Sequence, residues 1–595
     1  MSRKVQIVIL DSGVDVTHPL FQDTQVFCYD CCFDELSIED RDGHGTAVYH
    51  IIRRLNKEAE IINIKLFTTD WSVGEDTLIA ALEFVAKHFQ PDIVNMSLGC
   101  RICDDSNALY NACKKLTDTG AILISAFDNA GCLSYPAAYE NVIGVATGKF
   151  CHKNSDFEYC DDVVVNIAGY GGLQRVAWTN PRYVMLYGSS FACAHVAAQA
   201  ARFISEGART KDELLRRFKE ISIRKYERKN KKERCELFKI ERAALFPFNK
   251  EMHALVRFAE MLPFKIVGVY DRKFSASIGA STSVLLKDED VTDIRVQNID
   301  HIDWNSFDTL ILGCVSELIS LTGQKVIKNI IKDALERSKK IYSFGNISNL
   351  LSHPVSDRVF FPKIDDEDLP PDRFGMLYAI SKPVLGIFGT SSRQGKFTLQ
   401  LMLRKLFLEH GLRVGQIGTE PSALLFGMDF VYPMGHESTV YIKEYDTVRW
   451  LNEAMHSLCK QDNDIIMVGS QSGTLQYFPW NLEQCNIAQY NFLIGTMPDA
   501  IILCLNPYDE LNFVIRTISF LESTVGCKVI ALAVFPMEYR DDWSIAYGEK
   551  KALTNERFQK LKEELYEKCH VDIYNIGSQS DIIMLFEKII RYFRA

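Results

Sequence analysis

The sequence predicts an α/β protein made of several domains, each with a parallel sheet. Its 595 residues are more than one hydrophobic core usually organises. Apolar runs typical of buried strands occur in three regions, at residues 8–10, 264–271 and 384–388, and helical patterns follow them. Alternating strands and helices are typical of parallel sheets covered by helices. We therefore expect three α/β domains in succession along the chain.

The composition is that of an ordinary globular protein. Hydrophobic residues make up 47% and charged residues 24% of the chain. The formal net charge of −10 argues against general nucleic-acid binding. No apolar run reaches the length needed to cross a bilayer. We therefore expect neither a nucleic acid nor a membrane as partner.

Three short segments of the first domain each carry a reactive side chain beside glycine or small residues. They are Asp11-Ser12-Gly13, His44-Gly45-Thr46 and Gly188-Ser189-Ser190-Phe191-Ala192. Serine is a weak nucleophile, so Ser190 needs a base, and a histidine titrates near neutrality. An aspartate can hold the tautomer of that histidine and stabilise the imidazolium. Asp11, His44 and Ser190 therefore predict acyl transfer from a peptide bond to a serine.

Residues 1–225 resemble the subtilases, in which the triad follows the same order along the chain. The resemblance implies a subtilisin-like doubly wound parallel sheet and an endopeptidase that uses no cofactor or metal. Two further segments match the family. Asn95-Met96-Ser97-Leu98-Gly99 implies that Ser97, Leu98 and Gly99 bind extended substrate, and Asp128-Asn129-Ala130-Gly131 implies an oxyanion-hole donor at Asn129.

Some positions depart from the residues usual in that family. Ser189, Phe191 and Ala194 replace Thr, Met and Pro, and none of these changes removes a catalytic group. Cys100 and Asp128 each replace a glycine beside the primary specificity pocket. A carboxylate in the substrate-binding pocket at Asp128 predicts a preference for a basic P1 residue.

The chain start and the cysteines both bear on localisation. Because the predicted catalytic residue Asp11 lies so near the start of the sequence, we expect neither a signal peptide nor a folding pro-domain before the first strand. Seventeen cysteines fit a reducing compartment, so we expect a cytoplasmic protein.

The pairs Cys28/Cys31 and Cys100/Cys103 have the spacing of zinc or redox sites. No second aligned pair follows, which favours scattered free thiols and no metal.

The segment after the first domain is rich in charge and helical in pattern. Residues 210–242 carry many lysines and arginines, and residues 226–249 are expected to form a charged helical linker. Such a run binds an acidic leader peptide or, more often, is a solvated helix.

From residue 250 to 380 strands at 264–271, 309–313 and 340–344 alternate with a helix at 325–339, which predicts a Rossmann-like domain. It contains no G-x-G-x-x-G motif, so dinucleotide binding is not expected.

Residues 381–595 are expected to form a P-loop domain. The strand at 384–388 runs into Gly389-Thr390-Ser391-Ser392-Arg393-Gln394-Gly395-Lys396-Phe397-Thr398. Backbone N–H groups of such a loop and the following helix N-terminus face an anion, and lysine adds a positive charge. The residues expected to bind the phosphate-bearing ligand are Gly389, Thr390, Gly395, Lys396 and Thr398. The motif departs from the common P-loop, because its hydroxyl residue comes one position late.

Further segments of the C-terminal half narrow the resemblance. Gly415-Gln416-Ile417-Gly418, residues 464–471 and Gly495-Thr496-Met497-Pro498-Asp499-Ala500 occur in the order seen in the two-domain bacterial family typified by D-glutamate N-acetyltransferase. The resemblance implies acetyl-CoA or ATP as ligand. Gly469 stands where an acidic residue is expected, and no histidine follows near Gln476.

These features together suggest a function. We expect an intracellular endopeptidase that acts on a peptide or protein, with the precursor of a ribosomally made peptide as the favoured substrate. The acyltransferase-like module would modify the amine that cleavage frees. One alternative is a non-catalytic module that binds the leader or senses a nucleotide. Another is general intracellular turnover. The sequence is compatible with a monomer or an oligomer.

Overall fold

The computed structural model describes residues 4–594 except 22–24, 31–38, 68–72, 162–163, 227–236, 273–276, 287–290, 352–356, 436, 479, 481–485, 536 and 540–549. The chain divides into two compact units. The first contains residues up to 230 together with Pro370–Ala379, and the second contains Lys231–Leu369 and Ile380–Ala595. All three large sheets are predominantly parallel and covered by helices, which confirms the predicted α/β fold class.

The first unit is built on a nine-stranded sheet in the order β12-β8-β9-β7-β5-β4-β1-β3-β2. Its strands run parallel, except that β8 and its parallel neighbour β12 run opposite to the rest. In chain order the strands are β1 (Gln6–Asp11), β2 (Phe27–Asp30), β3 (Glu60–Lys65), β4 (Ile93–Met96), β5 (Ile122–Ala126), β7 (Val142–Thr147), β8 (Phe157–Cys160), β9 (Ile167–Gly169) and β12 (Arg224–Tyr226).

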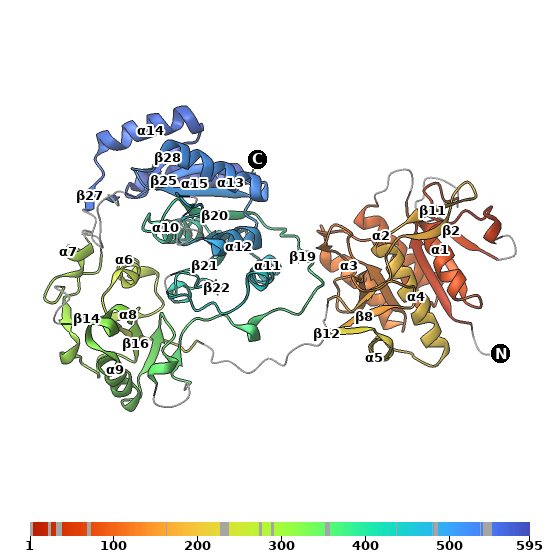
Figure 1. The fold of residues 1–595 in the computed structure, drawn as a ribbon, viewed down its shortest axis with the longest axis horizontal. Coiled ribbons are helices and arrows are strands. Elements are labelled where there is room, and N and C mark those ends of the chain that lie inside the picture. The colour runs from red at the N-terminus through yellow and green to blue at the C-terminus, as the bar shows by residue number, and fades with distance from the viewer. Residues whose placement is uncertain are drawn as a thin grey trace. The chain divides into compact units, whose positions relative to one another are not determined.

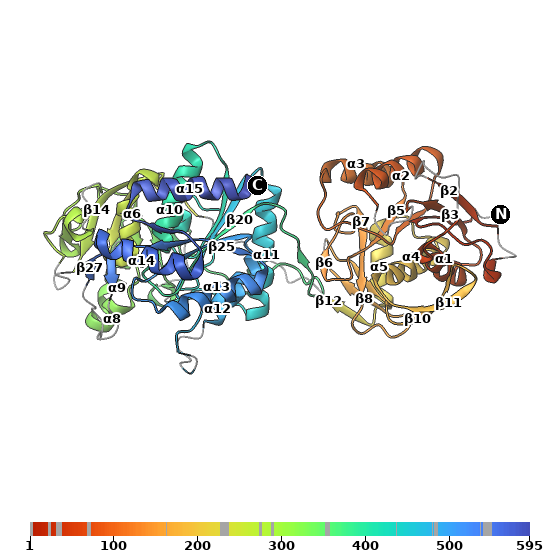
Figure 2. The ribbon, with the colours of Figure 1, turned by 90° about the horizontal axis from the view of Figure 1, so that it is seen from above.

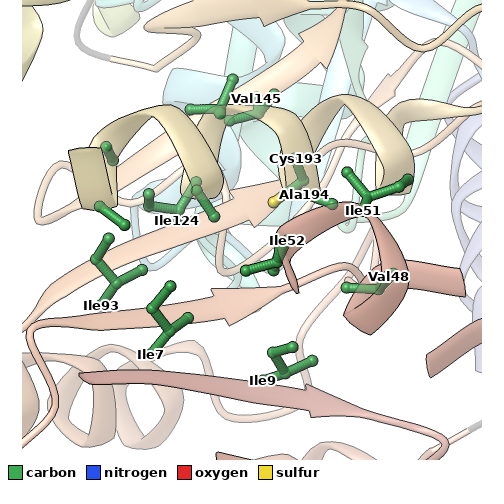
Figure 3. Packing of buried hydrophobic residues seen from close by; sticks show 14 of the residues in the cluster. Ile7, Ile9, Val48, Ile51, Ile52, Ile93, Ile124, Val145, Cys193 and Ala194 are labelled. Carbon is green, nitrogen blue, oxygen red and sulfur yellow. The ribbon is translucent and has the colours of Figure 1, made fainter. Parts of the chain in front are cut away.

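Helices cover both faces of this sheet (Figure 2). One face carries α2 (Glu75–His88) and α3 (Ser106–Asp118). The other carries α1 (His44–Leu55), α4 (Ser189–Ser205) and α5 (Lys211–Ile221). Figure 3 shows Ile52 of α1 and Cys193 of α4 in one cluster with Ile7, Ile93 and Ile124 of the strands. This core fixes the two helices whose N-termini carry His44 and Ser190.

The second unit begins with a six-stranded parallel sheet in the order β15-β14-β13-β16-β17-β18 (Figure 1). Numbered along the chain this is 3-2-1-4-5-6, the order of a Rossmann fold. The strands are β13 (Arg242–Phe246), β14 (Lys265–Asp271), β15 (Val296–Asn298), β16 (Thr309–Leu312), β17 (Lys340–Ser343) and β18 (Val359–Phe360). Helices α8 (Ser316–Thr322) and α9 (Gln324–Glu336) pack on one face, and α6 (His253–Arg257) packs on the other.

The prediction of a helical linker at residues 226–249 is wrong where those residues form strands. Tyr226 still belongs to the first sheet, and β13 lies at the centre of the second. The four residues Ala243–Phe246 are fully buried. The free energy gained by burying them favours a strand here over the helix that the preceding charged residues predicted. Residues 227–236 of the expected linker lie outside the described residues.

The P-loop domain contains a seven-stranded parallel sheet in the order β22-β21-β23-β20-β24-β25-β28 (Figure 1). The strands are β20 (Val384–Gly389), β21 (Val414–Gly418), β22 (Phe430–Val431), β23 (Ile465–Gly469), β24 (Ala500–Leu505), β25 (Lys528–Val534) and β28 (Ile573–Asn575). One face carries α10 (Lys396–Glu409) and α15 (Gln579–Arg594). The other carries α11 (Glu444–Lys460), α12 (Ile487–Thr496), α13 (Leu511–Val525) and α14 (Asn555–Cys569).

Residues 370–379, expected as the end of the Rossmann-like domain, belong to the first unit instead. Within them β19 (Leu377–Tyr378) pairs in parallel with β6 (Cys132–Leu133). Met376 and Tyr378 are nearly buried there, so apolar contacts with the first unit hold this segment. None of the helices that the structure describes is long and apolar enough to cross a membrane.

Candidate functional site

Asp11 and His44 form a hydrogen-bonded pair in the first unit. Asp11 ends β1 and His44 is the first residue of α1. The Nδ1 atom of His44 lies 2.7 Å from Oδ1 of Asp11. The Asp11 side chain is 3% exposed and that of His44 is 21% exposed. Because a carboxylate only accepts hydrogen bonds, Nδ1 carries the proton and Nε2 is left as the base.

Glycines allow the first turn of α1 to approach the end of β1. A Cβ atom at Gly45 would lie 2.2 Å from the carbonyl oxygen of Gly13, so any larger residue would push the two segments apart. The N–H of Gly45 donates to Oγ of Ser12 at 2.9 Å. The glycines in both motifs therefore serve to bring His44 onto Asp11.

A buried carboxylate that the sequence analysis missed stabilises this junction. Asp40 is 5% exposed and accepts the Ser12 hydroxyl at 2.9 Å. It also accepts the N–H groups of Gly43 and Thr46, at 2.8 and 2.9 Å. Asp40 therefore ties the end of β1 to the N-terminus of α1, where a negative charge is favourable. The sequence signal that indicates it is an acidic residue two positions before Asp42, separated from it by Arg41.

The pKa of His44 is raised above its ordinary value of 6.5. Burial opposes the charged imidazolium, but the charge of the Asp11 carboxylate and its hydrogen bond outweigh burial. Asp42 and Asp40 add smaller contributions of the same sign. Burial and the charge of Asp40 in turn raise the pKa of Asp42 to about 6. The site therefore favours a protonated His44 more than water does.

We predict that kcat/KM for peptide hydrolysis rises with pH along an acid limb whose midpoint lies above 6.5. Protonated His44 cannot accept the proton of Ser190, so activity appears only as pH rises through the pKa of His44. The measurement is a pH profile of kcat/KM on a chromogenic peptide. A midpoint below 6.5 would contradict the expected influence of Asp11.

Ser190 is the second residue of α4 and is anchored to the segment after β4. Its Oγ donates to the carbonyl oxygen of Ser97 at 3.1 Å, and Oγ of Ser97 donates to the carbonyl oxygen of Ser190 at 3.0 Å. The ring of the next residue, Phe191, lies 5.8 Å from the ring of His44. The structure thus joins His44 to Asp11 and Ser190 to Ser97. Catalysis by a triad would require the Ser190 hydroxyl to leave Ser97 and donate to Nε2 of His44.

Asn129 lies beside the residues that precede the nucleophile. Its Oδ1 accepts the N–H of Ser189 at 2.8 Å, and Gly188 leaves room for its amide. Because the oxygen end is held there, the Nδ2 end is the donor available to an oxyanion. Oγ of Ser189 donates to the carbonyl oxygen of Phe127 at 2.5 Å, which joins the same two segments a second time.

The predicted substrate-binding residues Ser97, Leu98 and Gly99 follow β4. The carbonyl oxygen of Leu98 accepts the Ser125 hydroxyl at 3.3 Å. A Cβ atom at Gly99 would lie 2.9 Å from the carbonyl oxygen of Tyr135, so position 99 needs glycine. Beyond it Cys100 and Tyr135 exchange two backbone hydrogen bonds, of 2.9 and 2.7 Å.

Asp128 is already paired with a cation. The guanidinium of Arg101 donates to both of its carboxylate oxygens, at 3.2 Å each. The two side chains are 55% and 25% exposed, for Arg101 and Asp128 respectively. The charge on which a basic P1 preference was predicted is therefore offset by Arg101.

The predicted cysteine pair Cys100 and Cys103 lies close together. Sγ of Cys100 is 3.3 Å from Sγ of Cys103, and this hydrogen bond lowers the pKa of Cys100. Cys28 is a free thiol, while Cys31 lies outside the described residues. Across the described part of the chain, no group of three or more His, Cys, Asp or Glu side chains is arranged to hold a metal ion.

The P-loop residues lie where β20 meets α10. Gly389 ends the strand, Gly395 has a positive φ of 74° and Lys396 begins the helix. A Cβ atom at Gly395 would lie 2.5 Å from the ring of Phe535. The Lys396 ammonium donates to the carbonyl oxygen of Ser391 at 2.6 Å, and burial lowers its pKa to about 8. A desolvated cation at a helix N-terminus is well suited to a phosphate.

Side-chain contacts close this loop on itself. The Thr390 hydroxyl donates to Asp509 at 2.5 Å and accepts from the Gln394 amide at 2.5 Å. The other end of that amide accepts the N–H of Ser391 at 3.1 Å. Thr398 is half-buried in the first turn of α10. The structure therefore brings together the strand end, the lysine and the helix start, and adds Asp509, which the sequence analysis missed.

An acidic residue interacts electrostatically with Lys396, but not from position 469. A Cβ atom at Gly469 would lie 1.9 Å from the Gln400 amide, so the Gln400 amide occupies the space that a side chain at position 469 would need. Glu420 instead follows β21. Burial and the nearby Glu251 raise its pKa to about 7, while a hydrogen bond from Gln471 and the charge of Lys396 lower it. Glu420 is the second residue of this site that the sequence analysis missed.

Two family models match the chain. Residues 2–233 match the subtilase family, and residues 375–534 match the P-loop domain of a domain of unknown function, DUF1611_C. The chain therefore has a subtilase domain at its N-terminal end and a DUF1611 P-loop domain in its C-terminal half. The likeness to D-glutamate N-acetyltransferase stays a prediction.

Similar curated relatives cover about a third of this chain. A thermophilic serine proteinase from Bacillus sp. (strain AK1) is 29% identical over 215 residues, which cover 34% of this chain and 52% of that protein. The major intracellular serine protease of Bacillus subtilis (strain 168) is 27% identical over 221 residues, covering 33% of this chain and 68% of that protein. The chain thus spans about half the length of the first relative and about two thirds of the second.

Similar solved structures also cover about a third of this chain. A cold adapted subtilisin-like serine proteinase is 23% identical, with 36% of this chain and 79% of that chain covered and a TM-score of 0.30. Sphericase is 22% identical, with 36% and 82% covered and a TM-score of 0.32.

Proposed function

We propose that the subtilase domain is a serine endopeptidase with Asp11, His44 and Ser190 as its triad. The observation that carries the proposal is the 2.7 Å contact between Nδ1 of His44 and Oδ1 of Asp11. This contact leaves Nε2 of His44 as a base. Ser190 lies at the N-terminus of α4, whose residues Cys193 and Ala194 pack in one core with Val48 and Ile51 of α1.

The reaction follows from these groups. His44 takes the proton of Ser190 as its Oγ attacks the scissile carbonyl, and Asp11 stabilises the imidazolium. The Nδ2 group of Asn129 donates to the oxyanion that forms. His44 then gives the proton to the leaving amine, and a water hydrolyses the acyl-enzyme by the same path. No metal or cofactor takes part in these steps.

An irreversible probe tests this proposal. A fluorophosphonate reacts with a serine only when a neighbouring base activates it. We expect it to label the intact chain at Ser190, located by peptide mass mapping, and to leave Ser190→Ala unlabelled. Ser205→Ala, an exposed change on the same helix, is the matched control and keeps full labelling. Equal labelling of the Ser190→Ala variant would reject the proposed nucleophile.

The setting we propose is cytoplasmic. The thirteen cysteines that the structure describes are all free thiols, as is usual in a reducing compartment. The Bacillus subtilis relative is named as intracellular, which supports the same setting for this chain.

We propose further that the substrate is the precursor of a ribosomally made peptide. Cleavage frees an α-amine, and the P-loop module, with acetyl-CoA or ATP bound, would modify it. Lys396, Gly395 and the N-terminus of α10 would hold a phosphate of that ligand, because Lys396 is buried and needs an anionic partner. The phosphate would take the place of the Ser391 carbonyl as the acceptor of the Lys396 ammonium.

Lys396→Ala is expected to weaken binding of acetyl-CoA or ATP by about 10- to 100-fold, because one charge-assisted hydrogen bond is worth about 1.5–3 kcal/mol. Isothermal titration of each ligand measures the loss. Lys405→Ala, on the same helix and paired at the surface with Glu260, is the control. Unchanged affinity for whichever ligand binds would contradict the phosphate role of Lys396.

The same variant separates the alternatives for the C-terminal half. A co-encoded peptide treated with intact protein and ligand is followed by mass spectrometry. Cleavage without modification in Lys396→Ala indicates an enzymatic module. Lost cleavage indicates a module that recognises the leader or senses a nucleotide. Broad hydrolysis of casein by the intact protein would favour general turnover instead.

A further inference from the structure

The segment Pro370–Ala379, here called the return segment, joins the peptidase unit from the C-terminal half. Its β19 pairs with β6, with Leu377 opposite Cys132 and Tyr378 opposite Leu133. The N–H of Leu377 donates to the carbonyl oxygen of Gly131 at 3.2 Å. Gly131 belongs to the loop Asp128-Asn129-Ala130-Gly131, here called the oxyanion loop. The return segment is therefore bonded directly to the loop that carries Asn129.

Side chains of the return segment also pack behind that loop. Met376 and Tyr378 are 7% and 6% exposed, in a cluster with Phe127 and Leu133. Phe127 directly precedes the oxyanion loop, and its carbonyl oxygen accepts the hydroxyl of Ser189. The cluster thus supports the residue that ties the oxyanion loop to the nucleophile helix.

Three contacts fix the rest of the return segment to the same unit. The guanidinium of Arg373 lies 4.8 Å from the ring centre of Tyr378. The ring of Phe374 meets Tyr226 of β12 edge-on at 4.9 Å. The thiol of Cys160 donates to the carbonyl oxygen of Asp372 at 3.0 Å. The return segment is therefore held along its length, from the edge strand β12 to the oxyanion loop.

The return segment lies outside the matched subtilase region. That match covers residues 2–233, whereas the return segment is connected at both ends to the second unit. A strand that completes the peptidase is thus supplied by the part of the chain that carries the other two sheets. Apolar residues of the peptidase core, among them Leu133 and Phe127, would lose cover without it.

We propose that the return segment is a positioning element that holds Asn129 in place, so that peptidase turnover depends on a segment of the C-terminal half. This inference rests on the proposed endopeptidase function. Asn129 acts on the charge that develops in the transition state, so a loosened loop lowers kcat and leaves KM nearly unchanged. Removing an oxyanion donor outright costs about 10²–10³ in kcat, which sets the upper limit of the effect.

The test uses the full-length protein with Met376→Ala and Tyr378→Ala combined, and Phe374→Ala as a milder variant at the half-buried edge. We expect kcat on a chromogenic peptide to fall by about 10- to 100-fold, within the limit set by loss of the donor itself, and KM to change little. Ser381→Ala, an exposed position just beyond the return segment, is the control and keeps wild-type kcat. Tyr378→Phe retains the buried ring, so we expect this variant to keep wild-type kcat where Tyr378→Ala loses it.

A double-mutant cycle with Asn129→Ala separates positioning from general destabilisation. If the return segment acts through Asn129, its variants lose little further kcat once Asn129 is gone. Losses that multiply, or that fall on KM, would overturn the inference, as would unchanged kcat in both variants. Absence of Ser190-dependent hydrolysis in the wild type would instead reject the proposed function itself.

Discussion

Ser190→Ala is expected to lower kcat for peptide hydrolysis by about 10⁶-fold, and His44→Ala by about as much. Neither residue contributes to catalysis without the other, because the Ser190 hydroxyl must transfer its proton to Nε2 of His44 as it attacks. The double variant is therefore expected to lose no more than either single one. The residual rate comes from substrate binding and from the Asn129 donor, which neither change removes.

Purified variants assayed with one chromogenic peptide give these rates, and Ser205→Ala serves as the control at the far end of α4. Thermal unfolding of each variant checks that the core under α1 and α4 is intact (Figure 3). Losses that multiply in the double variant would mean that Ser190 and His44 act independently. That result would contradict a triad.

The motifs were predictable from the sequence because their chemistry is local. Asp11-Ser12-Gly13 and His44-Gly45-Thr46 carry both a reactive group and the glycines that let it approach its partner. Asp40 escaped notice because its role depends on which donors surround it. Those donors come from the end of β1 and from the start of α1, so only the fold shows that one carboxylate holds both.

The domain limits were harder to predict because they depend on distant pairing. Charge after residue 210 suggested a helical linker, yet Ala243–Phe246 forms a central strand. The return segment is a stronger case. Met376 and Tyr378 are buried in a cluster with Phe127 and Leu133, which lie far away along the chain. No pattern of apolar residues within a short window predicts such a contact.

The P-loop shows the same division between local and distant information. Gly395 and Lys396 follow a strand and begin a helix, so the motif indicated their place. Two acidic residues of the same site were not indicated. Asp509, which accepts the Thr390 hydroxyl, comes from the loop after β24, and Glu420, which interacts electrostatically with Lys396, comes from the loop after β21. They meet because the carboxyl ends of parallel strands lie at one edge of the sheet.

Asp11→Asn is expected to lower kcat by about 10⁴-fold while leaving Ser190 and His44 in place. The change removes the negative charge that stabilises the imidazolium of His44. The amide group that replaces the carboxylate also has no orientation that satisfies all of its hydrogen bonds. Oδ2 of Asp11 is buried and has no hydrogen-bond partner among the described residues, so an amide group there stays unsatisfied. Turned round, the amide would face the N–H of Ser12, which donates to Oδ1 at 2.8 Å.

The pH profile identifies the cause of that loss. The Asp11 carboxylate raises the pKa of His44, so in Asp11→Asn the acid limb of kcat/KM should move to lower pH than in the wild type. Asp42→Asn is the control, since Asp42 acts on His44 only through its charge and should cost less than about tenfold. A large loss in Asp11→Asn with an unmoved acid limb would mean that the carboxylate positions His44 without stabilising its charge. Equal losses in both variants would show that the 2.7 Å contact has no special role in the reaction.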